Sequence, residues 1–118
     1  MFLNNSQHNH SLKTSMSNNG KSGLRLFNIE SNAEAIVHLK DVIMHHNSDD
    51  GVKAYGEGTV NIHGDKTAIH SNENYGICAF NSAKVLIHLS SHHNTSYNNE
   101  GIDRNTSWTG GTITNVED

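Results

Sequence analysis

The sequence predicts an all-β solenoid, in which short parallel strands stack on copies of themselves, and three observations predict it. First, three separate elements recur with a period of about 25 residues, which is typical of repeat proteins. Second, apolar and polar residues alternate within the elements, as in Val60-Asn61-Ile62-His63, which indicates half-buried strands. Third, clusters of Gly, Asn, Ser and Asp separate the elements, as expected at turns.

The first repeated element starts with glycine and occupies residues 51–54, 76–79 and 101–104. Its second position is aliphatic in each copy, which predicts an inward-facing column of Val52, Ile77 and Ile102. An earlier copy starts at Gly23, which lies further from Gly51 than the period requires, so we expect a short insertion of three residues in that coil.

The second element alternates aliphatic with polar residues and ends in His38, His63 and His88, which stand one period apart. The third element occupies residues 44–47 and 69–72, with a weaker copy at 94–97. Because all three elements keep one period, we expect each strand to pair in parallel with its equivalent one coil away, about 4.8 Å distant.

The length of 118 residues allows one small domain. We expect an irregular N-terminal segment or cap at residues 1–18, parallel coils at residues 19–103, and a degenerate last coil or C-terminal cap at residues 104–118. Hydrophobic residues make up only 33% of the chain. A solenoid with short inward strands needs few large apolar residues, whereas its turns need many small polar ones.

The composition excludes several classes of protein. No apolar run approaches the length of a membrane span, and no signal peptide is visible. The single cysteine, Cys78, excludes an internal disulfide framework and a multi-cysteine zinc module. The net charge of −4, with eight Lys and Arg residues, argues against a nucleic-acid partner.

The pattern Asn-x-x-x-Gly-[Val/Ile]-x-Ala, followed by Val-x-Ile-His and Ile-His-Ser-Asn, resembles the repeat of right-handed parallel β-helix proteins of the pectate-lyase-like group. The clearest copies run over residues 47–52 and 72–77, and the likeness covers roughly residues 19–103. The resemblance implies a right-handed parallel β-helix of about four coils and three sheets, with asparagines stacked at a tight turn. The group includes polysaccharide lyases and hydrolases as well as surface and adhesion proteins, so the repeat indicates a fold rather than a function.

A structural ladder is the first candidate feature. We expect the amides of Asn47 and Asn72 to bond neighbouring coils at a turn. Gly51, Gly76 and Gly101 are expected to provide a positive φ or a close approach between coils.

Stacked histidines are the second candidate feature. His38, His63 and His88 share one repeat position, and His45 and His70 share another, so pairs of imidazoles could hold Zn²⁺ or Cu²⁺ between coils. A column offers at most two ligands for each ion, and the alternative is an outward row that binds no metal.

Carboxylates and aromatic residues supply two further candidate sites. Asp49 and Asp50, with Glu57 and Asp65, are either turn residues or oxygen ligands for Ca²⁺. Equivalent residues Tyr55 and Phe80 could form, with Tyr97 and Trp108, an exposed platform for sugar rings. Cys78 falls in the column of Lys53, where it is expected to point outward without a catalytic role.

The sequence favours a non-catalytic module that presents a stacked surface to a polysaccharide or a protein. Two alternatives stay open, namely a fragment or remnant of a polysaccharide lyase or hydrolase, and a metal-binding module that uses the histidine columns. We expect no cofactor under the leading hypothesis. The open ends of a strand stack also predict end-to-end self-association.

Overall fold

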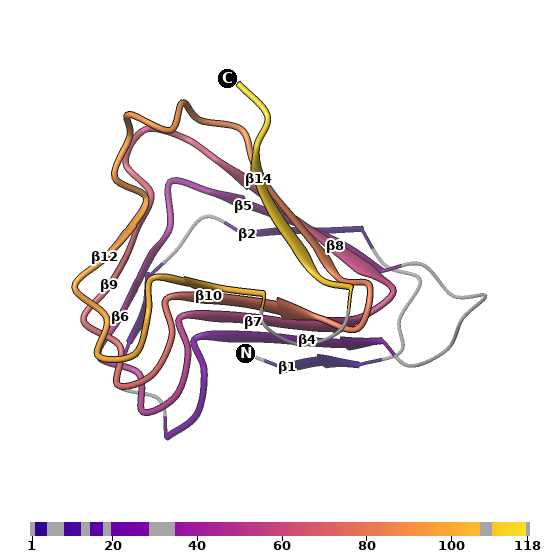
Figure 1. Cartoon of the computed structure of the whole chain (residues 1–118), viewed down its shortest axis with the longest axis horizontal. Helices are drawn as coiled ribbons and strands as arrows, with labels where there is room; N and C mark the ends of the chain where they lie inside the picture. The colour runs from indigo at the N-terminus through magenta and orange to yellow at the C-terminus, as the bar shows by residue number, and fades with distance from the viewer. Residues whose placement is uncertain are drawn as a thin grey trace.

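The computed structural model describes residues 2–4, 9–12, 15–17, 20–28, 35–106 and 110–117. Within these residues the structure is all-β, with fourteen short strands and no helix. The chain winds around a central core, and each turn of the chain contributes to three sides of the molecule (Figure 1). The expected fold class, a parallel β-helix, is confirmed.

Three parallel sheets form the three sides. Sheet 1 contains β1 (Phe2–Asn4), β4 (Leu24–Asn28), β7 (Val52–Gly56), β10 (Ile77–Phe80) and β13 (Arg104–Asn105). Sheet 2 contains β2 (Asn9–Leu12), β5 (Ala35–Lys40), β8 (Gly58–His63), β11 (Lys84–Ile87) and β14 (Thr112–Asn115). Sheet 3 contains β3 (Ser15–Ser17), β6 (Ile43–His45), β9 (Ala68–His70) and β12 (Ser96–Tyr97). The described strands thus make four complete coils and the first two strands of a fifth.

The core consists of aliphatic columns that the three sheets direct inward. Alternation within the strands produces these columns, as the burial pattern of β5 shows. The predicted pairs Val52–Ile77, Val60–Val85 and Met44–Ile69 all face each other in the register, and their side chains are fully buried. The fully buried large side chains of the described residues are Leu24, Leu26, Val37, Leu39, Val42, Met44, Val52, Val60, Ile62, Ile69, Ile77, Val85 and Ile87.

The period varies at the corners of the coil. Leu24 pairs with Val52, so the expected insertion of three residues is present. In sheet 2, however, Val37 pairs with Val60, which is two positions short of the constant period. His38 therefore faces Asn61 rather than His63 in the backbone register, although its ring still stacks on the ring of His63.

A second irregularity, at the corner between the fourth and fifth coils, corrects the predictions for Gly101 and Ile102. Ile77 pairs with Arg104, two positions beyond the constant period, so Ile102 lies outside the aliphatic column and is 52% exposed. Gly101 is likewise exposed and is not the equivalent of Gly76. Two extra residues in the corner before Arg104 shift the chain, so the Gly-Ile pair that recurs in the sequence does not reflect the pairing of the strands.

The N-terminal segment also differs from the expected irregular segment or cap. β1, β2 and β3 pair in parallel with β4, β5 and β6, so these three strands contribute a first coil. Backbone hydrogen bonds hold such a coil without a repeated side-chain pattern, which explains why the sequence did not reveal it. At the other end, β13 and β14 pair with β10 and β11 and form a partial last coil.

Candidate functional site

An asparagine ladder fixes the corner at which the chain passes from sheet 3 to sheet 1. Asn47 Nδ2 donates to Asn72 Oδ1 over 2.9 Å, and Asn72 Nδ2 donates to Asn99 Oδ1 over 2.8 Å. The same oxygens accept the backbone N–H groups of Asn47 and Asn72. Asn47 and Asn72 are fully buried, so the ladder satisfies polar groups that water cannot reach.

Two glycines follow the ladder because the coils approach closely there. A Cβ added to Gly51 would lie 2.8 Å from the carbonyl oxygen of Gly76 and 2.9 Å from Asn72 Nδ2. A Cβ on Gly76 would lie 2.7 Å from the carbonyl oxygen of Asp103. Neither glycine has a positive φ, so close approach is the reason for both.

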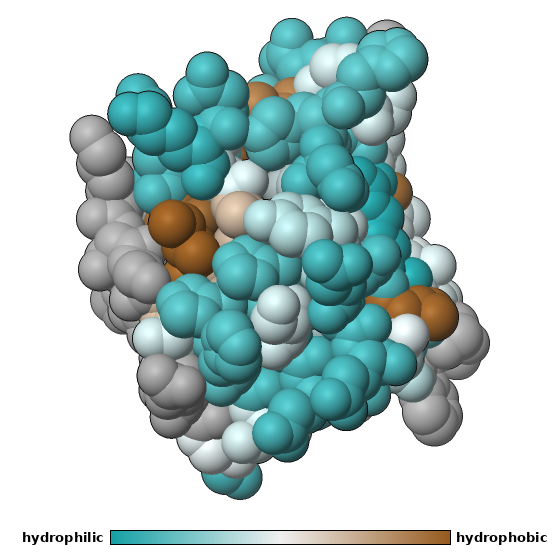
Figure 2. Space-filling model, turned by 90° about the vertical axis from the view of Figure 1, so that its left-hand side faces the viewer, coloured by the Kyte–Doolittle hydropathy of each residue, from teal (hydrophilic) through white to brown (hydrophobic). Residues whose placement is uncertain are grey.

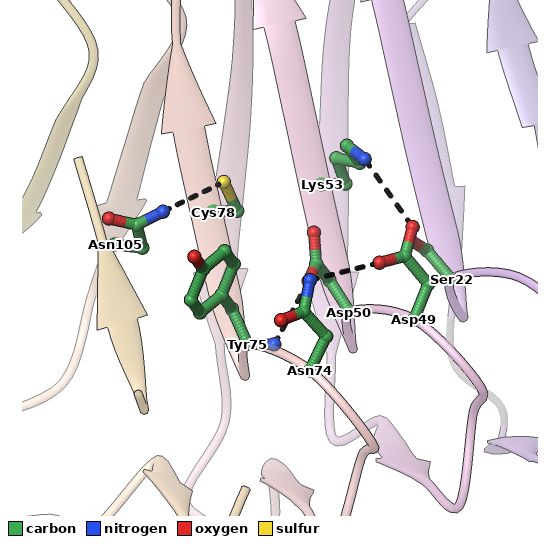
Figure 3. A network of polar contacts seen from close by, with 8 residues as sticks. All are labelled: Ser22, Asp49, Asp50, Lys53, Asn74, Tyr75, Cys78 and Asn105. Carbon is green, nitrogen blue, oxygen red and sulfur yellow. Dashed lines mark hydrogen bonds and ion pairs between the residues drawn. The ribbon is translucent and has the colours of Figure 1, made fainter. Parts of the chain in front are cut away.

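A groove lies on the outer face of sheet 1, beyond this corner. It lies over the paired strands β7 and β10 and has a volume of about 540 Å³. Its wall comprises Asp50, Lys53, Tyr55, Asn74, Tyr75, Cys78, Phe80 and Asn81. Figure 3 shows the corner end of this groove, where the side chains of β7 and β10 and of the turns before them converge. A concave surface of this size, with aromatic walls and a few polar groups, is typical of small-ligand sites.

Asp50 is the most unusual polar residue of the groove. It is 1% exposed, and its Oδ1 accepts the backbone N–H of Tyr75 over 3.0 Å. Among the described residues, no hydrogen-bond donor reaches its buried Oδ2. Burial raises the pKa of Asp50 to about 6, against the opposing effects of the Tyr75 N–H, the charge of Lys53 and the nearby Asn74 amide.

In the neighbouring carboxylate, Asp49, both oxygens accept hydrogen bonds (Figure 3). Its Oδ1 accepts from Asn74 Nδ2 over 3.1 Å, and its Oδ2 accepts from Ser22 Oγ and Lys53 Nζ, each over 3.4 Å. Burial opposes its ionisation, but the Asn74 hydrogen bond and the Lys53 charge outweigh burial and lower the pKa of Asp49. Adjacent carboxylates therefore have opposite pKa shifts.

Cys78 pairs with Lys53 in the register, as expected, but its side chain is only 2% exposed. Asn105 Nδ2 lies 3.7 Å from its sulfur. Burial, together with the negative charge of Asp50, raises the pKa of the Cys78 thiol to about 11. The thiol is therefore protonated at neutral pH, which is unfavourable for a nucleophile.

Tyr55 and Phe80 pair in the register and both line the groove. The centroids of their rings are 4.8 Å apart at an interplanar angle of 79°, so the two rings form an aromatic corner. Lys53 Nζ lies 6.0 Å from the centroid of the Phe80 ring. Tyr97 lies on sheet 3, away from these two rings, and Trp108 is outside the described residues.

Two rows of stacked rings occupy the outer faces of the other sheets. On sheet 2, the ring of His63 lies between those of His38 and His88, at centroid distances of 5.6 and 4.2 Å. On sheet 3, the ring of His70 lies between those of His45 and Tyr97, at 5.3 and 5.2 Å. Figure 2 shows that the side formed by sheet 3 is mainly hydrophilic.

The histidine in the middle of each row has a lowered pKa. Burial, followed by the charges of His88, His38 and Lys40, lowers the pKa of His63. Burial and the charge of His45 lower the pKa of His70 in the same way. Within the described residues, no group of three or more His, Cys, Asp or Glu side chains could hold a metal ion.

The four carboxylates considered as Ca²⁺ ligands do not come together. Asp49 and Asp50 lie at the corner between sheets 3 and 1, Glu57 at the next corner, and Asp65 at the third. The coil separates these corners, so the four residues cannot form one site.

Three residues of this region were not predicted from the sequence. Asn99 extends the ladder at a spacing of 27 residues, so the constant period concealed it. Tyr75 and Asn74 line the groove from a turn, and no periodic signal marks them. Asn74 does stand 25 residues after Asp49, to which it bonds, and that spacing could have suggested the contact.

These features define the class of the protein as a parallel β-solenoid with a ligand-sized groove on one outer face. No protein-family model, curated protein or solved structure matches the chain. The resemblance to the pectate-lyase-like group therefore stays a prediction. No helix in the described part of the chain is long and apolar enough to cross a membrane.

Proposed function

We propose that the chain is a non-catalytic binding module whose groove on sheet 1 holds a glycan. The observation that carries this proposal is the combination, in one groove, of the aromatic corner and a buried carboxylate oxygen without a partner among the described residues. Sugar rings offer apolar C–H faces that pack against aromatic side chains, and hydroxyl groups that bond to carboxylates and amides.

The distribution of charge supports binding rather than glycoside hydrolysis. Hydrolysis of a glycosidic bond ordinarily needs two carboxylates that flank the bond. Among the described residues, Asp50 is the only carboxylate that lines the groove, and the neighbouring Asp49 is held by Ser22, Lys53 and Asn74. The protonated thiol of Cys78 provides no alternative nucleophile.

One observation favours a remnant of a polysaccharide-active enzyme as the second candidate. The pKa of Asp50, raised to about 6, is the kind of value that a general acid requires. The test of function must therefore include an assay for cleaved products.

The proposal is tested by applying the purified chain to an array of neutral and charged glycans, followed by calorimetry with the glycans that bind. We expect Tyr55→Ala to weaken binding by about tenfold, because it removes one ring of the aromatic corner. Tyr97→Ala is the matched control, since it removes the same side chain from sheet 3, and it should change the affinity less than twofold.

Recovery of intact glycan from the complex is the expected result. Release of shorter products would instead support the remnant enzyme. Absence of any glycan binding, or equal losses in Tyr55→Ala and Tyr97→Ala, would overturn the proposed function.

A further inference from the structure

The buried oxygen of Asp50 is a hydrogen-bond acceptor that the described protein leaves unused. Asp50 is 1% exposed, and its Oδ2 has no donor among the described residues. A buried carboxylate oxygen without a donor is unfavourable, because burial removes the water that would otherwise bond to it. Asp50 also lines the groove, so this oxygen belongs to a residue of the groove wall, and a bound group must approach it past the side chains that bury it.

A hydrogen bond to the other carboxylate oxygen, Oδ1, fixes the orientation of Asp50. Oδ1 is held by the backbone N–H of Tyr75 over 3.0 Å, which leaves Oδ2 as the oxygen available to a ligand. In Figure 3, one oxygen of Asp50 points along the strands, between Cys78 and Lys53, and no hydrogen bond is drawn to it. The carboxylate is thus presented to the groove in one defined direction before any ligand binds.

We infer that Asp50 is the residue that determines the specificity of the groove, in that its Oδ2 accepts a hydrogen bond from a hydroxyl group of a neutral sugar. This inference rests on the proposed glycan-binding function. It adds that the bound sugar must direct a free hydroxyl toward the corner end of the groove, while its ring lies toward Tyr55 and Phe80.

The charges around Asp50 favour a neutral donor over an ammonium group. Lys53 lines the same groove, and its Nζ lies 6.0 Å from the centroid of the Phe80 ring, so a cation already occupies the space near that ring. The groups that act electrostatically on Asp50 or respond to it are Asp49, Lys53 and Cys78, and Asp49 is paired with Lys53. A second ammonium would be repelled by Lys53, whereas a hydroxyl would not be.

Binding should depend on pH through Asp50. Because the pKa of Asp50 is about 6, its carboxylate is the main form at pH 8 and becomes protonated below pH 6. A hydroxyl donor stabilises the ionised form, so a bound sugar should lower this pKa. The affinity should therefore fall by up to about tenfold for each pH unit between the pKa of the free protein, about 6, and the lower pKa of the complex, and it should level off below that.

The experiment measures the affinity of the full chain for cellohexaose, mannohexaose, chitohexaose and the hexamer of glucosamine, by calorimetry at pH 8 and pH 5. The variant is Asp50→Asn, which keeps an acceptor for the Tyr75 N–H but replaces the free oxygen by an NH₂ donor. Asp65→Asn is the matched control, because it removes the same charge at another corner of the coil.

We expect at least one neutral hexamer to bind, Asp50→Asn to weaken it about tenfold or more at pH 8, and Asp65→Asn to leave it within twofold. Carboxyl ¹³C shifts of the wild-type protein provide a second measurement that needs no variant, and they should show a lower pKa of Asp50 in the complex.

Equal affinities for wild type and Asp50→Asn, or an unchanged pKa of Asp50 in the complex, would refute the inference while leaving glycan binding intact. Stronger binding of the glucosamine hexamer, lost in Asp50→Asn, would replace the hydroxyl donor by an ammonium and also refute it. If none of the four hexamers binds and the array is negative, the proposed function itself fails, and the inference fails with it.

Discussion

Replacement of Asn72 by alanine tests the corner on which the groove depends. The Asn72 side chain is fully buried and lies in the middle of the ladder, with Asn47 on one side and Asn99 on the other. Its Oδ1 accepts from the backbone N–H and the Nδ2 of Asn47. Its Nδ2 donates to the carbonyl oxygen of Met44 and to Asn99 Oδ1. Alanine removes all four hydrogen bonds at once.

The four lost bonds do not cost the same. Asn47 Nδ2 also donates to the carbonyl of Met16, and Asn99 Oδ1 also accepts from the backbone of Asn72, so these two groups keep a partner. The N–H of Asn47 and the carbonyl of Met44 each lose a bond in the interior, at about 1–3 kcal/mol each. We therefore expect Asn72→Ala to lower the free energy of unfolding by about 4 kcal/mol, which is a large part of the stability of a small domain.

The assay is urea unfolding, followed by circular dichroism at pH 7. Asn47→Ala should also lower the free energy of unfolding, by about 1–3 kcal/mol, because it removes the bond from Asn47 Nδ2 to Asn72 Oδ1. Asn94→Ala, whose side chain is exposed, is the control and should change the free energy by less than about 0.5 kcal/mol. A loss in Asn72→Ala of no more than that of Asn94→Ala would refute the reasoning.

Two further predictions concern pH and stability. Ionisation of Asp50 is disfavoured in the folded state, so wild type should lose stability as pH rises from about 4 to about 6. In urea unfolding, Asp50→Asn should therefore be more stable than wild type by up to about 3 kcal/mol at pH 8, and as stable as wild type near pH 4. The lowered pKa values of His63 and His70 act in the opposite direction, because protonation favours the unfolded chain below pH 6.5. In the Asp50→Asn variant, which lacks the effect of Asp50, the melting temperature should therefore fall between pH 8 and pH 5. A constant melting temperature would contradict the stacked rows.

The sequence alone determined the architecture of this protein. A constant period and the alternation within each element are local properties, and they predicted parallel coils, the aliphatic pairs such as Met44–Ile69, and the extra residues after Gly23. The same regularity placed Asn47 and Asn72 on one corner. Such predictions succeed because stacking repeats the same contact from coil to coil.

The tertiary structure decided the registers wherever a corner changes in length. A corner that gains or loses two residues shifts the register of the next strand by two positions. Residues that face inward still face inward after such a shift, so the alternation is unchanged, but each residue meets a different partner. His38 was therefore matched to His63 by spacing but faces Asn61, and Ile102 left the core although it follows the repeat. Asn99 entered the ladder for the same reason, from a position that the period does not mark.

The groove was decided in three dimensions. Asp49 and Asp50 are identical neighbours in the sequence, yet one is held by three side chains and the other presents a buried oxygen to the groove. Which carboxylate finds a partner depends on the direction of each side chain at the corner and on Asn74 and Tyr75 of the next coil. The sequence thus determined the coil and its stacked columns. Only the folded chain, through contacts between coils, decided which of the two adjacent carboxylates lines the ligand-sized groove and has an oxygen that no described donor reaches.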